Sequence, residues 1–326
     1  MSAATDPSAD AERARRRARA ARSMRLDAVS VEVVRALQEA GIDVVLLKGV
    51  SLARWLYPEG GRFWTDVDLW ADPDRRTESD VVLRELGFVP TPPLPDDYET
   101  TYRRGDVVID LHHSLPRVPI PAAQAWRAIA PHRTTMPLLD LDLPVLDEVG
   151  LTYHAAHHAA QHGRTGGSPR PHDAAPNENA GHVQEDLRRA LAIATPAQWQ
   201  GAAALATRLG TAPLLAAVLD LTPEGRALAT GLALPAPDAA SRLSATAADR
   251  DDHRAHALAW ALQAGRRRER AGRLVRLLLP TPAWMREVHL GRDVGTPALL
   301  VAYLRRLGGI AARTPTVLRR WWRARG

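Results

Sequence analysis

The spacing of apolar and polar positions divides the chain into a first part that contains strands and a second part that is helical. Apolar residues recur at helical spacing between Leu26 and Leu37, after a polar, basic start. A short apolar run at 42–47 predicts a buried strand, and segment 98–115 predicts two strands around a Gly-containing turn. From about residue 147 the chain becomes rich in Ala and Leu, with Pro and Gly between the segments, which is typical of successive helices.

These patterns predict an α+β protein with a small mixed β-sheet followed by a mainly α-helical domain. We expect a basic, frayed segment over residues 1–25, an α/β domain over 26–146 and a helical domain over 147–326. Within the helical domain, the Gly, Pro and Asn content of residues 163–181 predicts a mobile loop, and the chain ends in a basic helix.

Composition adds exclusions to this picture. The chain has 326 residues with 45% hydrophobic and 25% charged content, which is typical of a globular protein. It has no cysteine, which excludes disulfides, thiolate zinc sites and a cysteine nucleophile. No apolar run is long enough to span a bilayer and the start lacks a signal-peptide core, so we expect a cytoplasmic protein.

The net charge of +6 comes mostly from the two ends of the chain. Basic runs occupy residues 13–25 and 318–326, and the second run also contains two Trp. A solvated helix face explains such runs, and so does weak contact with nucleic acid or an anionic membrane surface. The sequence leaves both readings open.

Two carboxylates lie one residue apart in the apolar run FWTDVDLW. On a strand, Asp66 and Asp68 share one face and Val67 points away. Such carboxylates repel each other unless a cation neutralises them, and oxygen ligands suit Mg²⁺ or Mn²⁺. The alternative is a solvated edge strand. The flanking Trp64 and Trp70 either stack on a base or pack in the core.

A third carboxylate and a glycine turn strengthen the metal hypothesis. Asp110 lies in the strand-like run VVIDLHH, and a neighbouring strand position would bring it beside the other two. Three carboxylates can hold two metals about 4 Å apart, as phosphoryl and nucleotidyl transfer require. Upstream, LLKGVSLARWL predicts a strand, a Lys48-Gly49 turn and a helix, which bring a cation and backbone N–H groups to a phosphate. The chain lacks the Walker pattern, which disfavours a P-loop NTPase.

Together, LLKG, RFWTDVDLW, the later Gly-Phe and VVIDLHH resemble a family of uncharacterised nucleotidyltransferases. The resemblance implies a polymerase-β-like fold, with a mixed sheet and helices on one face, that binds an NTP and two Mg²⁺. It implies these roles: Asp66, Asp68 and Asp110 as catalytic metal ligands, with Asp110 also a base, and Lys48, Gly49, Ser51 and Arg62 around the triphosphate. Many polymerase-β-like enzymes have Gly-Ser where this chain has Lys48-Gly49.

A histidine-rich helix is predicted at 147–163, where His154, His158 and His162 share one stripe. Ala155 occupies the position where a zinc metalloprotease needs Glu, which disfavours that class. The family resemblance implies a His-rich helix followed by an Asp-Leu pair, which matches Asp186-Leu187. On the predicted strand VVIDLHH, alternation places His112 on the same face as Asp110. The accessory candidates are therefore His112, His154, His158 and Asp186. The alternative for this helix is a domain interface without a direct role.

The leading hypothesis is a Mg²⁺-dependent (or Mn²⁺-dependent) enzyme that moves NMP from an NTP to a hydroxyl. The acceptor would lie on a small molecule, a protein or RNA. A catalytically silent, basic binding module on the same fold and a metal-dependent phosphohydrolase are the alternatives. The phosphohydrolase would use the same carboxylates without releasing pyrophosphate.

Overall fold

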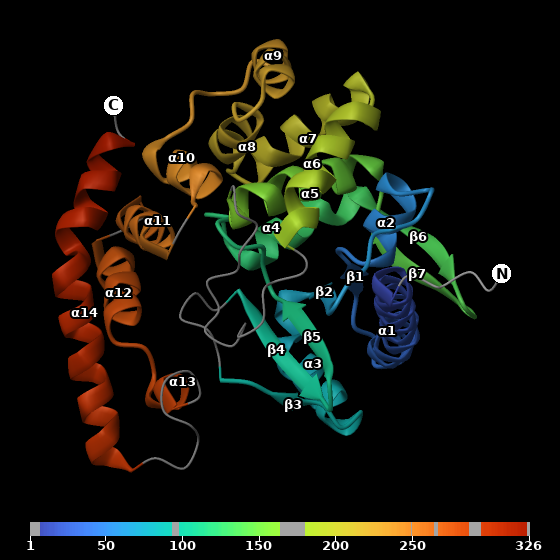
Figure 1. Cartoon of the computed structure of the whole chain (residues 1–326), viewed down its shortest axis with the longest axis horizontal. Coiled ribbons are helices and arrows are strands. Elements are labelled where there is room, and N and C mark those ends of the chain that lie inside the picture. Colours follow the sequence, from blue (N-terminus) through green and yellow to red (C-terminus); the bar gives the residue numbers. More distant parts are fainter. Residues whose placement is uncertain are drawn as a thin grey trace.

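The computed structural model describes residues 7–92, 98–163, 180–248, 250–263, 267–286 and 295–324 (Figure 1). The strands are β1 (Val44–Leu46), β2 (Val67–Ala71), β3 (Val89–Pro90), β4 (Glu99–Arg104), β5 (Val107–His112), β6 (Arg133–Leu138) and β7 (Leu141–Leu146). The helices of the first part are α1 (Pro7–Glu39), α2 (Val50–Leu56), α3 (Arg76–Glu85) and α4 (Ala122–Ile129), with 3₁₀ turns at Pro73–Arg75 and Ala130–His132. The later helices are α5 (Glu148–His162), α6 (Ala180–Ile193), α7 (Pro196–Arg208), α8 (Ala212–Leu219), α9 (Pro223–Gly231), α10 (Ala239–Thr246), α11 (Arg250–Gln263), α12 (Arg267–Leu278), α13 (Pro282–Met285) and α14 (Thr296–Arg323).

The strands form one seven-stranded mixed sheet in the order β3-β4-β5-β2-β1-β7-β6. Strands β2 and β5 are parallel, as are β1 and β7, and the other neighbours are antiparallel. The predicted pair of strands around Gly105 is the antiparallel pair β4 and β5. Strands β3 and β6 form the two edges. The mixed sheet followed by helices confirms the predicted fold class.

Helices cover both faces of the sheet, whereas the family resemblance implies helices on one face. Every residue of β2 is buried, so this central strand needs apolar cover on both sides. Leu69 packs in the core that α1 and α3 share with the sheet. Trp70 points the other way and meets Trp126 of α4 edge-on, with 5.6 Å between the ring centroids. Trp70 is therefore a core residue.

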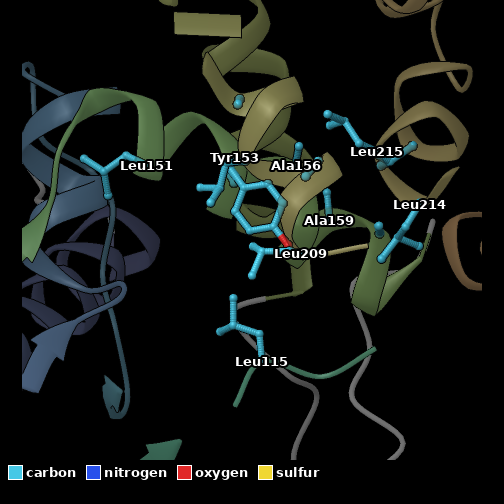
Figure 2. Packing of buried hydrophobic residues seen from close by; sticks show 14 of the residues in the cluster. Leu115, Leu151, Tyr153, Ala156, Ala159, Leu209, Leu214 and Leu215 are labelled. Atoms are coloured by element: carbon cyan, nitrogen blue, oxygen red, sulfur yellow. The ribbon is translucent and has the colours of Figure 1, made fainter. Parts of the chain in front are cut away.

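The core on the second face continues into the helical part of the chain. Figure 2 shows Tyr153 and Ala156 of α5 among Leu115, Leu209 and Leu214. The same cluster contains sheet residues such as Val45. The hydrophobic cluster therefore crosses the boundary predicted at 146/147 and reaches Ala245, whereas α11, α13 and α14 contribute to two smaller, separate clusters. Helix α14 runs along the outer edge of the molecule (Figure 1).

The N-terminal segment differs from the expected frayed chain, because α1 begins at Pro7. Ala and Arg are strong helix formers, so the basic stretch extends the helix without needing to be buried. Its last turns also pack: Ser23 is buried and its hydroxyl accepts a hydrogen bond of 3.3 Å from the Trp64 backbone N–H.

Two further expectations concern the rest of the chain. Nearly all of the predicted mobile loop at 163–181 lies outside the described residues; Gly163 caps α5 and Ala180 begins α6. Across the described residues, no helix combines the length and the apolar character that crossing a membrane requires.

Candidate active site

The carboxylates come together because β2 and β5 pair in parallel. Asp68 lies directly opposite Asp110 in the register of the two strands. Asp66 precedes β2 and lies two residues before Asp68, so it belongs to the same face. One oxygen from each of the three carboxylates can be chosen so that all lie within 4.8 Å of one another. The sequence predicted that these three carboxylates lie close together, and the register of β2 against β5 explains why they do.

This cluster fits a hard divalent cation. Asp68 and Asp110 are buried and Asp66 is half-buried, so the three like charges stand close together with little water around them. Carboxylate oxygens are the ligands that Mg²⁺ and Mn²⁺ prefer. A bound cation would relieve the repulsion and would polarise a phosphoryl oxygen.

Lys48 is the protein's own cation at this cluster. Its Nζ lies 2.7 Å from Asp68 Oδ1 and 3.4 Å from His158 Nε2. Burial opposes the charged ammonium, but the carboxylates, chiefly that of Asp68, outweigh it and raise the pKa of Lys48 above its usual value. In return, although burial alone would raise the pKa of Asp68, Lys48 and His112 hold it well below its usual range. Lys48 therefore stays charged beside an ionised carboxylate.

The glycine turn directly follows this lysine. Gly49 caps α2 with φ 69° and ψ −123°, a backbone conformation that only glycine adopts readily. The Ser51 hydroxyl donates a hydrogen bond of 3.1 Å to the Lys48 carbonyl and so closes the turn. A Cβ at position 49 would lie 3.6 Å from the Trp64 indole, which packs over the turn.

Arg62 lies behind the turn, where it makes a buried bidentate salt bridge with Asp186. Its Nη2 is 2.9 Å from Asp186 Oδ2 and its Nε is 3.1 Å from Oδ1. The Tyr57 hydroxyl donates to the same carboxylate at 2.7 Å, and Arg62 Nη1 donates to the Gly49 carbonyl at 3.4 Å. Arg62 and Asp186 are thus in contact, and the guanidinium makes its hydrogen bonds to Asp186 of α6 and to the Gly49 turn. This geometry favours a positioning role for Arg62 over direct contact with phosphate.

His112 links the carboxylate cluster to a residue that the sequence analysis missed. Its Nε2 lies 3.3 Å from Asp68 Oδ1, and its Nδ1 lies 3.3 Å from Glu99 Oε2. Burial alone would lower the pKa of His112, but the two carboxylates outweigh it and raise the pKa. Tyr98 stacks on its ring with 6.1 Å between the centroids. His112 thus shares the face of Asp110, as predicted, and contacts Asp68.

Thr101 is a second residue that the sequence analysis missed. Its hydroxyl donates a hydrogen bond of 2.6 Å to Asp110 Oδ1. In β4, Thr101 pairs with Asp110 and Glu99 pairs with His112. The alternation of ETTYRR placed Glu99 and Thr101 on one face, but only the register identifies what they touch.

The histidine stripe of α5 faces the site. His154 and His158 are buried and stack with 5.9 Å between centroids, and His162 meets His158 edge-on at 4.5 Å. Neither ring nitrogen of His154 has a hydrogen-bond partner among the described residues. Burial, and then the charge of Lys48, hold the pKa of both His154 and His158 well below the usual value. His154 and His158 are therefore neutral side chains, and His158 contacts Lys48.

The fourth histidine of α5, His157, makes the protein sensitive to acid. Its Nε2 lies 2.8 Å from the Pro116 carbonyl oxygen and its Nδ1 3.1 Å from the Tyr153 hydroxyl, and burial lowers its pKa to about 4. Below pH ~6.5 the His157 imidazole binds a proton in the unfolded chain but not in the folded chain. The free energy of unfolding therefore falls as the pH decreases.

We expect His157 to account for a loss of about 3 kcal/mol in the free energy of unfolding between pH ~6.5 and ~4. Urea unfolding of the wild type and of His157→Gln at several pH values measures this. The variant should show a shallower pH dependence, and equal slopes would contradict the assignment.

A sequence profile described as an uncharacterised nucleotidyltransferase matches residues 6–172, just over half of the chain. The chain belongs to this family. The nucleotidyltransferase assignment agrees with the carboxylates of β2 and β5, both of which lie inside the matched region. No curated protein matches the sequence.

Several solved structures of other proteins show a distant likeness to this chain. ANT(2'')-Ia in complex with adenylyl-2''-tobramycin is 17% identical, with 56% of this chain and 97% of that chain covered and a TM-score of 0.40. The solution structure of the antibiotic-resistance factor ANT(2'')-Ia is 15% identical, with 55% and 89% covered and a TM-score of 0.37. An antigenic nucleotidyltransferase-like protein from Paracoccidioides brasiliensis is 17% identical, with 66% and 95% covered and a TM-score of 0.37.

The nucleotidyltransferase also has a cavity of about 210 Å³ between α1 and the segment that precedes β2. The residues that line it include Arg19 and Arg22 of α1, together with Trp64, Thr65 and His182. Thr65 directly precedes Asp66, and its carbonyl accepts a hydrogen bond of 3.1 Å from Arg22 Nη2. The basic start of the chain therefore contributes to the surroundings of the candidate site.

Proposed function

We propose that this nucleotidyltransferase moves NMP from an NTP to a hydroxyl acceptor and releases pyrophosphate, with Mg²⁺ or Mn²⁺ as cofactor. The observation that carries the proposal is the opposition of Asp68 and Asp110 across parallel strands, with Asp66 completing the cluster. These three carboxylates would hold the metal, which supplies Lewis acidity at the phosphate when it is bound.

The chain's own groups then have distinct roles. Lys48, at the head of the Gly49 turn, would bind the triphosphate by exchanging its contact with Asp68 for one with phosphate oxygens. The acceptor hydroxyl forms a new bond to the α-phosphorus, the bond from that phosphorus to the β-phosphate oxygen breaks, and pyrophosphate leaves. The hydroxyl proton would pass to Asp110. Asp186 holds Arg62, and Arg62 holds the turn.

The first test is pyrophosphate release from each NTP with Mg²⁺, with and without candidate acceptors from small molecules, proteins and RNA. Pyrophosphate formed in step with a nucleotidylated acceptor supports the proposal. Metal-dependent release of inorganic phosphate alone would identify the phosphohydrolase instead. If neither NTP nor Mg²⁺ raises the melting temperature, the proposal fails and the binding-module alternative gains, because a ligand that binds the native state must stabilise it.

Replacing Lys48 with alanine should weaken NTP binding more than metal binding. An ammonium group serves phosphate and cannot ligate a cation. Its removal also frees Asp68 from a competing positive charge, so Mg²⁺ affinity should hold or rise. Calorimetric titration of Lys48→Ala with Mg²⁺, and with NTP in the presence of Mg²⁺, measures both affinities.

Arg54 provides the matched control for this prediction. It is an exposed cation on α2, and its Nη1 donates to the Pro137 carbonyl at 2.7 Å. Arg54→Ala should leave NTP affinity close to that of the wild type. An unchanged NTP affinity in Lys48→Ala would rule out Lys48 as the phosphate ligand.

A further inference from the structure

The C-terminal part of the chain exposes an unusual amount of apolar surface. Among the described residues, nine of the fourteen large apolar side chains that are exposed lie between Val275 and Trp322. Globular proteins seldom leave a contiguous apolar patch without a partner. This concentration lies far along the chain from the carboxylates, and the proposed transfer does not use it.

Most of these side chains form one stripe along α14. Leu300, Leu304, Leu307, Leu318 and Trp322 are separated by four, three, eleven and four positions, so they lie on one side of the helix. Leu300, Leu304 and Trp322 are 61%, 60% and 63% exposed. We name these five residues the α14 stripe.

The opposite side of α14 is fixed to the protein. Leu299, Ala302 and Val317 are buried. Arg306 Nη2 donates to the Leu277 carbonyl at 2.8 Å, and Arg320 Nη1 forms a salt bridge with Asp252 at 2.5 Å. The helix is therefore held along its length at the edge of the molecule (Figure 1), and the side chains of the α14 stripe are exposed.

The charge of α14 selects the partner. The helix has six Arg and neither Asp nor Glu. Arg305, Arg319 and Arg323 are exposed and lie along one flank of the α14 stripe at helical spacing. Apolar side chains flanked by Arg, with a Trp near one end, are the features of helices that lie in the interface of an anionic membrane. A second copy of the same cationic face would be repelled, and nucleic acid would leave the leucines exposed.

We propose that α14 binds the surface of anionic membranes, with the α14 stripe among the acyl chains and its flanking arginines at the lipid phosphates. This binding would hold the nucleotidyltransferase at a lipid surface and is independent of the proposed transfer reaction. The sequence left the partner of the basic C-terminus open, and this proposal assigns it to anionic membranes and to the residues of the α14 stripe with their flanking arginines.

Flotation of the full-length protein with vesicles tests the proposal. Vesicles of phosphatidylcholine with roughly one third phosphatidylglycerol should carry the protein upward, and pure phosphatidylcholine vesicles should carry much less. Raising the salt concentration should weaken binding without abolishing it, because salt screens the arginines and leaves apolar burial intact. A wild type that binds neither kind of vesicle would overturn the proposal.

Variants assign the surface. Leu300→Ser with Leu304→Ser should lower the affinity for anionic vesicles at least about tenfold, because two exposed leucines no longer enter the lipid. Arg305→Gln with Arg319→Gln should lower it and flatten the salt dependence. Both pairs of side chains are exposed, so the melting temperature should stay near that of the wild type.

Val81→Ser is the matched control, since Val81 is an exposed apolar residue on α3. It should bind vesicles like the wild type. Equal binding by the wild type and the double leucine variant would overturn the proposal. The proposal would also be overturned if the wild type formed a dimer in solution that the double leucine variant dissociated while vesicle binding stayed unchanged. The α14 stripe would then be a contact between two copies of the chain.

Discussion

Exchange of Asp110 for asparagine should reduce nucleotidyl transfer by at least about a thousandfold while the protein remains folded. The substitution removes one of three negative charges from a site that needs them to hold a dication. Asparagine keeps an oxygen that can accept the hydrogen bond from the Thr101 hydroxyl. Pyrophosphate release measures the activity, and thermal unfolding with and without Mg²⁺ measures metal binding.

The same substitution should leave the metal-free protein equally stable or more stable. Removing one carboxylate lessens the repulsion within the cluster, so the metal-free melting temperature should hold or rise while stabilisation by Mg²⁺ shrinks. Asp68→Asn is a poorer test, because it also takes the ionic partner from Lys48. Residues that act as a unit are not additive, so Asp66→Asn combined with Asp110→Asn should be little worse than either change alone.

Asp140 offers an internal control with the same Asp-x-Asp spacing, since Asp142 follows it. Its side chain is 74% exposed and pairs with Arg35 at 2.7 Å, away from the carboxylate cluster. Asp140→Asn should change activity and Mg²⁺ stabilisation little. If Asp140→Asn removed that stabilisation while Asp110→Asn retained it, the metal site would be wrongly placed.

Loss of Asp186 should be among the most destabilising single changes in the chain. Asp186→Ala leaves Arg62 buried without its carboxylate and also removes the acceptor of the Tyr57 hydroxyl. Breaking a buried pair in this way costs about 3–5 kcal/mol, because one charge remains without compensation. Urea unfolding measures the loss. The folded fraction should also bind NTP more weakly, since Arg62 no longer braces the Gly49 turn.

An exposed pair and a double variant show whether burial is the cause. Asp220 pairs with Arg226 on the surface at 2.6 Å, so Asp220→Ala should cost less than about 1 kcal/mol. Arg62→Met combined with Asp186→Leu should recover much of the stability lost in Asp186→Ala, because no unpaired charge remains. A double variant as unstable as the single one would argue against an unpaired charge as the source of the loss.

The sequence was informative where the chemistry is local. Alternation along one strand placed Asp66 and Asp68 on the same face, and the Lys48-Gly49 turn could be expected from a glycine between a strand and a helix. The helical spacing of His154 and His158 likewise predicted their shared stripe, which the stacked rings confirm. Periodicity depends only on residues that are close in the sequence, so it can be recognised without knowledge of the fold.

Contacts between distant segments could not be predicted in the same way. The salt bridge between Arg62 and Asp186 joins residues 124 positions apart. Glu99 and Thr101 reach the site only through the register of β4 against β5. A shift of one residue in that register would turn both side chains to the opposite face. The basic start of α1 was interpreted from charge alone, although its position beside Thr65 depends on packing.

The two edges of the sheet bear on how the protein avoids association through its strands. An exposed edge offers unpaired N–H and C=O groups to any passing strand. Edge strand β3 is only two residues long and ends in Pro90, and the opposite edge, β6, contains Pro137. Proline has no N–H to donate, so each edge lacks a hydrogen-bond donor that a docking strand would need. The sheet thus remains open in topology but is a poor template for extension, which guards the newly made chain against aggregation.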